Sequence, residues 1–296
     1  MKTAAAVSHR VQIQNILCAT DFSHAAAVAL PFAAQIAKSF GAKLFVIHAK
    51  TPENYAVPVA ENWAAVNAQL EEFVVETRRN LLNQFPSVES DVLVADGGVS
   101  AVVEKLAQEK KADLIVVGTS GRGGLGKFIL GSTAEDVLRR ANCPVLTVGP
   151  HSQSQPPQGA RFAKIVYATN FSDTSATAAA YAVTLAQEFQ AHLTLLHVVE
   201  HPKAGEVVHP HELEEAVLER LRGLVAKDAE LWCEPRAVVL QGLPAQGILQ
   251  AAQEEGADLI VLGLKHPKGL LRATHLPTVA HHVIAGATCP VLTIRA

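Results

Sequence analysis

The chain has 296 residues, enough for two domains of ordinary size that each bury a core. Hydrophobic residues make up 49% and charged residues 18%, which excludes a disordered chain and favours strands covered on both faces. The formal net charge is -3 and no long run of Lys or Arg occurs, so we expect no binding to nucleic acid or to a membrane surface.

The cysteines and the apolar segments indicate the compartment. Cys18, Cys143, Cys233 and Cys289 stand far apart and form no CxxC pair. We therefore expect reduced thiols and neither a disulfide framework nor a structural zinc site. The sequence has no signal-peptide-like apolar core near its start and no uncharged apolar run of about 18 residues, which predicts a cytoplasmic protein.

Short β-branched runs alternate with helical patterns along the first half, which is typical of βαβ units around a parallel sheet. The expected strands lie near 13–19, 43–48, 90–95, 113–118 and 144–149. A first helix follows Asp21-Phe22-Ser23 and stops at Gly41, and further helices are expected near 99–110 and 132–141. A longer helix between the second and third strands has an apolar stripe that we assign to the core, made of Trp63, Val66, Leu70, Phe73, Val74 and Leu81. Ser132-Thr133-Ala134-Glu135 predicts a capping box at the start of the last helix.

Four sequence blocks of the first half return in the second half in the same order. Residues 16–23 (ILCATDFS) return as 165–172 (IVYATNFS), and 43–49, 112–118 and 143–148 return as 192–198, 257–263 and 289–294. The offset between the blocks is about 145–149 residues. We therefore predict two tandem domains, 1–150 and 161–296, joined by the polar, Pro-rich linker 151–160.

The segment 118–128 (GTSGRGGLGKF) matches two common glycine motifs, and both matches have a defect. Gly121-x-Gly123-x-x-Gly126 fits the dinucleotide fingerprint, but that motif belongs to the first strand–helix turn and this segment follows the fourth strand. Gly121-x4-Gly126-Lys127 resembles a P-loop, but Phe128 stands where a hydroxyl should bind magnesium. We disfavour both interpretations.

A third pattern, Gly118-x2-Gly121-x9-Gly131-Ser132, brings two glycines and a hydroxyl to the start of a helix. Glycines let backbone amides approach phosphate oxygens, and the unpaired amides and positive dipole end of the helix attract an anion. In the alternative interpretation these glycines only shape a loop and Ser132 only caps the helix.

Together with Ala-Thr-Asp-Phe-Ser at 19–23, this pattern resembles the universal stress protein family in its tandem form, over nearly the whole chain outside the linker. The resemblance implies an α/β fold with two tandem open parallel five-stranded sheets flanked by helices, Rossmann-like and of the adenine nucleotide alpha hydrolase type. It also implies ATP, with Mg²⁺, across the carboxyl ends of the strands. The two halves are expected to form an internal pseudo-dimer through the edge strands 145–148 and 291–294, and a homodimer of the whole chain stays open.

The resemblance also assigns site residues in the first half. Those expected around adenine and ribose are Ala19, Thr20, Asp21, Ala49, Val117 and Gly118. Those expected around the phosphates are Gly121, Gly131, Ser132 and Thr133. We add Arg122 because a guanidinium pairs well with phosphate oxygens, although it could equally be a solvated loop charge.

The second half departs from the pattern. Alignment through the strands places Asn170 opposite Asp21, His266 opposite Gly121, Leu276 opposite Gly131 and Pro277 opposite Ser132. A Cβ at 266 obstructs close backbone approach, and Pro277 removes a hydroxyl and an amide donor. We expect the second half to keep the architecture and to lose ATP binding.

Histidines are concentrated in the second half, where they include His209 and His211. No Cys or carboxylate cluster completes a metal site there, so we interpret them as solvated or core residues. No catalytic constellation stands out either. We therefore expect a cytoplasmic, ATP-binding stress or signalling protein with an unidentified protein partner. The alternatives are a nucleotide-independent interaction or chaperone-like scaffold, and slow ATP hydrolysis.

Overall fold

The computed structural model describes residues 10–22, 24–51, 63–119, 130–150, 152, 162–200, 210–225, 235–264 and 278–295. The chain divides into two compact units. The first unit comprises residues 12–150, and the second comprises residues 151–296 together with the segment that precedes Gln12. Arg10 and Val11 group with the second unit because they bond to Glu188 and Thr184 of its first helix.

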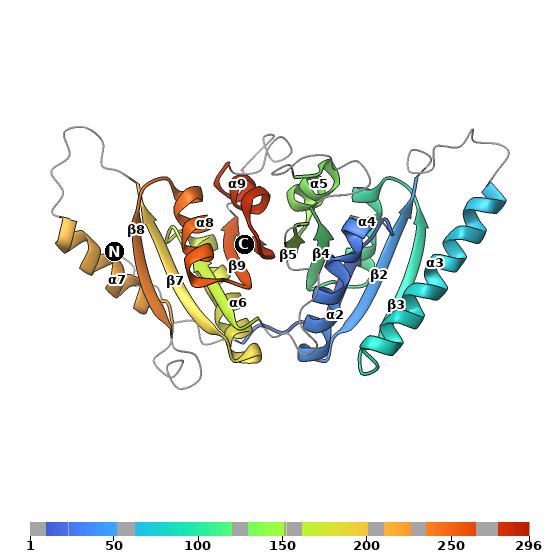
Figure 1. The fold of residues 1–296 in the computed structure, drawn as a ribbon, viewed down its shortest axis with the longest axis horizontal. Helices are drawn as coiled ribbons and strands as arrows, with labels where there is room; N and C mark the ends of the chain where they lie inside the picture. Colours follow the sequence, from blue (N-terminus) through green and yellow to red (C-terminus); the bar gives the residue numbers. More distant parts are fainter. Residues whose placement is uncertain are drawn as a thin grey trace. The chain divides into compact units, whose positions relative to one another are not determined.

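The first unit alternates strands with helices, as the sequence predicts (Figure 1). Its strands are β1 (Asn15–Ala19), β2 (Lys43–Lys50), β3 (Ser90–Asp96), β4 (Leu114–Gly118) and β5 (Val145–Val148). Its helices are α1 (His24–Ala27), α2 (Ala29–Phe40), α3 (Trp63–Gln84), α4 (Val99–Glu109) and α5 (Ser132–Arg140). The predicted strand positions are confirmed. Strands β1, β2, β4 and β5 are buried along most of their length and are correspondingly apolar, whereas β3 is partly exposed.

The strands of the first unit are parallel and follow the order β3-β2-β1-β4-β5. Strands β2 and β3 are therefore added on one side of β1, and strands β4 and β5 are added on its other side. Because parallel crossovers are right-handed, α2 and α3 cover one face and α4 and α5 cover the other. Contacts between α4 and α5, and between α2 and β1, agree with this arrangement.

The second unit repeats this topology. Its strands are β6 (Lys164–Ala168), β7 (His192–Val199), β8 (Arg236–Gln241), β9 (Leu259–Leu264) and β10 (Val291–Arg295). Its helices are α6 (Asp173–Phe189), α7 (Pro210–Arg222), α8 (Pro244–Glu255) and α9 (Thr278–Gly286). The strands are again parallel, in the order β8-β7-β6-β9-β10. The predicted tandem α/β fold is confirmed.

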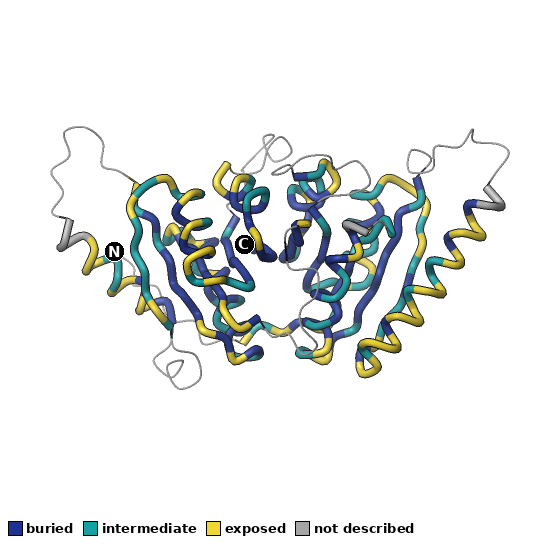
Figure 2. The backbone as a smooth tube through the Cα atoms, viewed as in Figure 1, coloured by how far each residue is buried: buried dark blue, intermediate teal, exposed yellow. Residues whose placement is uncertain are grey.

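The core of each unit is its sheet, where buried residues follow the strands (Figure 2). Helix α3 is exposed along much of its length, but Val66, Leu70 and Leu81 of its predicted apolar stripe are buried and Phe73 and Val74 are half-buried. The side chain of Trp63 lies outside the described part. Within the described ranges, every helix is too short or too polar to cross a membrane.

The first helix differs from the sequence prediction. The structure has two helices, because α1 ends at Ala27 and α2 begins at Ala29. Pro31 has no amide hydrogen to donate to the Ala27 carbonyl, which explains the interruption. The predicted stop at Gly41 is confirmed, since this glycine adopts φ +63° and its amide donates to the Ala37 carbonyl.

An aspartate before the fourth strand of each unit holds the start of the first strand. The Oδ2 atom of Asp113 accepts hydrogen bonds from the amides of Gln14 (2.8 Å) and Asn15 (3.0 Å). Asp258 Oδ2 accepts from Ala163 (2.9 Å) and Lys164 (3.0 Å) in the same way. The repeated Ala-Asp-Leu block is therefore structural: its carboxylate satisfies two backbone donors that have no strand partner.

Substituting this aspartate should destabilise its unit. We expect Asp113→Ala to lower the free energy of unfolding by about 1–3 kcal/mol, because two amides lose a charged acceptor. Asp258→Ala should act similarly in the second unit. Urea denaturation measures the change. The control is Asp96→Ala, which removes an exposed ion pair with Lys50 and should cost less than about 0.5 kcal/mol. An effect of Asp113→Ala no larger than the control would contradict the assignment.

The described thiols should be unreactive. Burial raises the pKa of Cys18, Cys143 and Cys289 to about 12, and nearby Asp113 and Asp258 contribute to the shifts of the latter two. In a Cys233→Ser background, we expect iodoacetamide to label the native chain much more slowly than the denatured chain at about pH 8. The unfolded chain ionises its thiols first, so their contribution to stability should fall as the pH rises from about 9 towards 12. Equal labelling rates would contradict this.

Candidate functional site

The carboxyl ends of β1 and β4 form the edge of the first sheet where the strand order reverses. Ala19 and Val117 are direct partners in the β1–β4 ladder, and Gly118 ends β4 beside them. Ala49 lies near the end of β2 on the other side of β1. Open α/β sheets bind ligands at this kind of switch point. The structure therefore brings these predicted residues to one edge.

The turn after β1 is held by its own hydrogen bonds. The Thr20 amide donates to the Ile47 carbonyl (2.9 Å), and the Phe22 amide donates to Thr20 Oγ1 (3.0 Å). Phe22 adopts φ +58°, a left-handed conformation that is uncommon for a bulky residue. The buried His48 places Nδ1 2.9 Å from the Thr20 carbonyl oxygen and stacks its ring on Phe22. The turn thus presents Asp21 at the edge of the sheet.

The second unit builds the same turn. The Phe171 amide donates to Thr169 Oγ1 (2.9 Å), Phe171 adopts φ +58°, and His197 Nδ1 lies 2.7 Å from the Thr169 carbonyl oxygen. Sequence analysis missed the role of His48 and His197, although both occupy the same position in the repeated second-strand block. The turn therefore belongs to the fold and does not depend on a ligand.

The start of α5 lies beside the end of β4. The Gly131 amide donates to the Thr119 carbonyl (2.8 Å), and the extended backbone of Gly131 makes it the cap residue. The predicted capping box is therefore wrong, since Ser132 is already helical and no side chain caps this helix. Among the described residues, no side chain accepts a hydrogen bond from the first-turn amides, and Ser132 and Thr133 are exposed. Such a helix start suits an anion.

Only glycine fits at position 131. A Cβ atom there would lie 2.9 Å from the Thr119 carbonyl oxygen, closer than real Cβ atoms approach backbone. The absence of a side chain lets the start of α5 lie directly against the residue that follows Gly118 at the end of β4. Gly121 and Arg122, also predicted here, lie outside the described residues.

The corresponding helix of the second unit corrects the alignment of the halves. Helix α9 buries Ala280, Val283 and Ile284, as α5 buries Ala134, Val137 and Leu138. The Ala287 amide bonds to the Val283 carbonyl as Ala141 bonds to Val137. In these matches, the number of residues between equivalent positions of the two halves is larger by one than in the alignment of β4 with β9.

The corrected register places Pro277 opposite Gly131, Thr278 opposite Ser132 and Leu276 opposite Leu130. The predicted loss of a hydroxyl opposite Ser132 is therefore wrong, because Thr278 supplies one. What the second half lacks is the glycine amide that bonds to the end of the fourth strand, since proline has no amide hydrogen. His266, Leu276 and Pro277 lie outside the described part.

The counterpart of Asp21 is used inside its own turn. Asn170 Oδ1 accepts hydrogen bonds from the Ser172 amide (3.1 Å) and from Ser175 Oγ (2.7 Å). The Ser172 side chain in turn caps α6 by accepting from the Ser175 amide. In the first unit, Ala26 stands in the place of Ser175 and has no hydroxyl to donate. The second unit therefore engages its polar side chain locally.

A family model for the universal stress protein family matches residues 12–149 and again residues 161–295. The chain belongs to the universal stress protein family. The double match shows that this universal stress protein has the tandem form. A universal stress protein of Methanocaldococcus jannaschii is 32% identical over 138 residues, which cover 46% of this chain and 81% of that protein. A Staphylococcus aureus relative with the same family name is 34% identical over 146 residues, covering 47% and 85%.

A solved structure supports the fold of this universal stress protein. The crystal structure of a universal stress protein from Archaeoglobus fulgidus matches it with a TM-score of 0.69 at 19% identity, covering 96% of this chain and 97% of that one. Within the ranges that the structure describes, no group of three His, Cys, Asp or Glu side chains is arranged to hold a metal. His209 and the side chain of His211 lie outside those ranges.

The close approach at Gly131 predicts a specific sensitivity. We expect Gly131→Ala to destabilise the chain by about 1–3 kcal/mol, because its Cβ collides with a backbone oxygen. Gly98 is a matched control: it also caps a helix without a side-chain bond, but a Cβ there meets no atom within 4 Å. Gly98→Ala should cost less than about 1 kcal/mol. Thermal or urea unfolding measures both, and equal losses would show that the contact with Thr119 does not matter.

Proposed function

We propose that this universal stress protein binds one molecule of ATP, with Mg²⁺, in its first unit. The observation that carries the proposal is the glycine contact at the start of α5. Gly131 lies against the end of β4 without a side chain, and within the described part of the chain the first-turn amides of α5 have no side-chain acceptor. These amides and the hydroxyls of Ser132 and Thr133 would receive the phosphates.

The nucleoside would lie along the carboxyl ends of β1, β2 and β4. Ala49 and Val117 are buried apolar residues that suit one face of a flat base. Thr20 and Gly118 would border the ribose, and Asp21 would accept hydrogen bonds from the nucleoside. Gly121 and Arg122 join the proposal from the sequence motif alone, beside the phosphates.

The second unit would not bind ATP. Pro277 stands where the first unit has Gly131, and proline has no amide hydrogen. The second unit therefore cannot form the hydrogen bond that Gly131 donates to the end of the fourth strand. The Asn170 oxygen already accepts two hydrogen bonds in its turn, and asparagine lacks the carboxylate that Asp21 has at this position. We therefore propose a single nucleotide for each chain.

The proposed activity is regulated binding in the cytoplasm. No residue is assigned a catalytic role, and His48, which lies close to the turn, has its Nδ1 engaged with the Thr20 carbonyl. Nucleotide occupancy would alter the surface that a partner protein meets, and the protein would act in stress or signalling through that partner. Pairing of the two halves as an internal pseudo-dimer, and of whole chains as a homodimer, remain predictions from the sequence.

Calorimetric titration of the full chain with Mg-ATP tests the proposal. We expect one site for each chain and a rise in melting temperature, because ATP would bind the native state only. Ser132→Ala and Thr133→Ala should each weaken binding about tenfold or more, since each removes a hydrogen bond to a charged phosphate. Thr278→Ala in the second unit is the matched control and should leave the affinity unchanged.

Three outcomes would redirect the proposal. Two equivalent sites for each chain would show that the second unit is intact. No binding at millimolar ATP would favour the nucleotide-independent scaffold. Steady release of ADP that Ser132→Ala abolishes would show slow hydrolysis in place of simple binding.

A further inference from the structure

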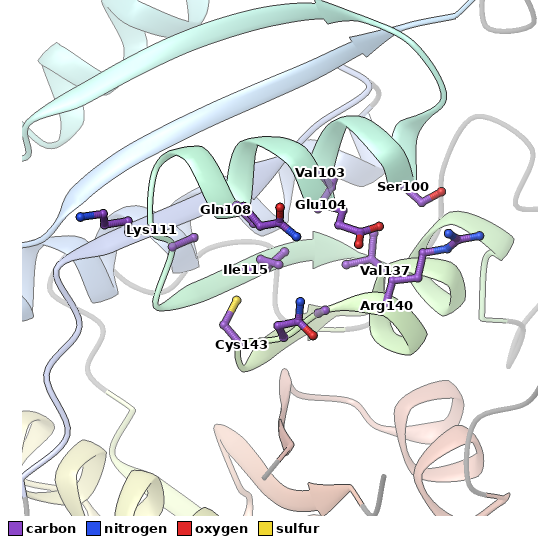
Figure 3. Close-up of a pocket in the computed structure, with 13 residues that line it drawn as sticks. Ser100, Val103, Glu104, Gln108, Lys111, Ile115, Val137, Arg140 and Cys143 are labelled. Carbon is purple, nitrogen blue, oxygen red and sulfur yellow. The ribbon is translucent and has the colours of Figure 1, made fainter. Parts of the chain in front are cut away.

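The first unit has a second hollow, in the groove between α4 and α5. It has a volume of about 160 Å³ and runs from Ser100, near the start of α4, to Cys143, before β5 (Figure 3). Its wall is largely apolar and includes Val103, Ala107, Ile115, Val137, Ala141 and Cys143. The groove does not include the residues proposed to hold ATP.

The fold does not require this groove, because the second unit fills the same place. The first-turn hydrogen bond from Val102 to Gly98 in α4 corresponds to the bond from Gly247 to Leu243 in α8. In this alignment, Leu249 of α8 occupies the position of Glu104 in α4. The register of α5 and α9 places Gly286 opposite Arg140.

In the second unit, a Cβ on Gly286 would lie 2.8 Å from Leu249 Cδ1. The leucine side chain therefore occupies the space beside the glycine. The first unit replaces this leucine–glycine contact with two charged side chains that flank an open groove.

Among the charged groups that line the groove, Glu104 faces it without a hydrogen bond or ion pair to any described residue. Arg140 is held in an ion pair of its own, since its Nε atom lies 3.2 Å from Asp136 Oδ2, and the same aspartate also pairs with Arg139. Burial alone would raise the pKa of Asp136, but hydrogen bonds from Ser100 and Arg140 outweigh burial and lower it, which keeps this partner ionised. The Lys111 ammonium points away from the other lining residues (Figure 3).

Glu104 itself is half-buried and extends from α4 towards Val137 of α5 (Figure 3). It has no hydrogen bond or ion pair with any residue of the described ranges. At the far end of the groove, the Cys143 thiol stays protonated and adds no charge. The groove thus combines an apolar wall with a carboxylate, Glu104, that has no partner among the described residues.

We propose that this groove binds a small organic ammonium, in which an apolar body fills the hollow and a protonated amine pairs with Glu104. An apolar cavity of about 150 Å³ accommodates a molecule the size of benzene, so the ligand would have about 8–10 non-hydrogen atoms. A half-buried carboxylate on an apolar wall favours a cation that also has an apolar part, because the charge forms a strong hydrogen bond and the apolar part buries its surface against the wall. This inference is independent of the proposed ATP site.

The test adds 2-phenylethylamine to the full chain and follows the ¹H–¹⁵N NMR spectrum. The probe is titrated to about 10 mM, which is the weakest dissociation constant expected for a ligand of this size. We expect saturable shifts in the amides of α4 and α5 and none in those of α8 and α9. Glu104→Gln should weaken binding about tenfold or more, because a charged hydrogen bond is lost while the shape is kept. Neutral 2-phenylethanol should bind more weakly than the amine by a similar factor.

Two further variants sharpen the test. The double substitution Glu104→Leu with Arg140→Gly copies the second unit, so it should fill the groove and abolish the shifts. Lys105→Gln, at an exposed neighbouring position, is the control and should change nothing. The proposal is overturned if the probe causes no saturable shifts, if shifts are spread over both units, or if Glu104→Gln or the neutral alcohol binds as tightly. The single substitution decides the matter even if the double variant does not fold.

Discussion

The hydrogen bond from the Gly131 amide to the Thr119 carbonyl fixes where α5 begins relative to β4. Three properties follow from this one contact. The two backbone segments approach so closely that a side chain at position 131 would collide with the carbonyl oxygen. Because glycine is the cap residue, the cap supplies no side-chain acceptor for the first amides of the helix. Those amides therefore face the same edge of the sheet as Ala19 and Gly118, and the candidate site exists only where this contact forms.

Much of the fold could be predicted from the sequence because its main constraint is local. A run such as Leu114–Gly118, apolar at nearly every position, has few alternatives to a strand buried on both faces, and the repeat confirms the pattern. The cap of α5 could not be predicted, because Gly131 and Ser132 are both acceptable cap residues and the distant Thr119 decides between them. The interruption at Val28 was predictable in principle, since Pro31 provides the signal. The role of His48 depended on a contact with Thr20 across two strands.

The duplication separates what the fold needs from what each half can vary. Both units keep an aspartate before the fourth strand and a left-handed phenylalanine whose ring contacts the histidine of the second strand, so these features serve folding. The units differ at positions where the shared fold accepts either residue. These positions are the start of the last helix, Asp21 and its counterpart Asn170, and Glu104 and its counterpart Leu249. In the second unit, Asn170 accepts two hydrogen bonds within its turn, Leu249 packs beside Gly286, and a proline precedes the last helix.

The proline at position 277 has a consequence for how such a chain would respond to changing nucleotide concentration. Two equal, coupled sites in one molecule can produce a sigmoidal, switch-like response, whereas a lone site can produce only a hyperbolic one. With the single ATP site proposed for the first unit, the tandem chain would follow the adenylate pool gradually, over about two decades of concentration around its dissociation constant. Any sharper threshold would have to arise from association between whole molecules.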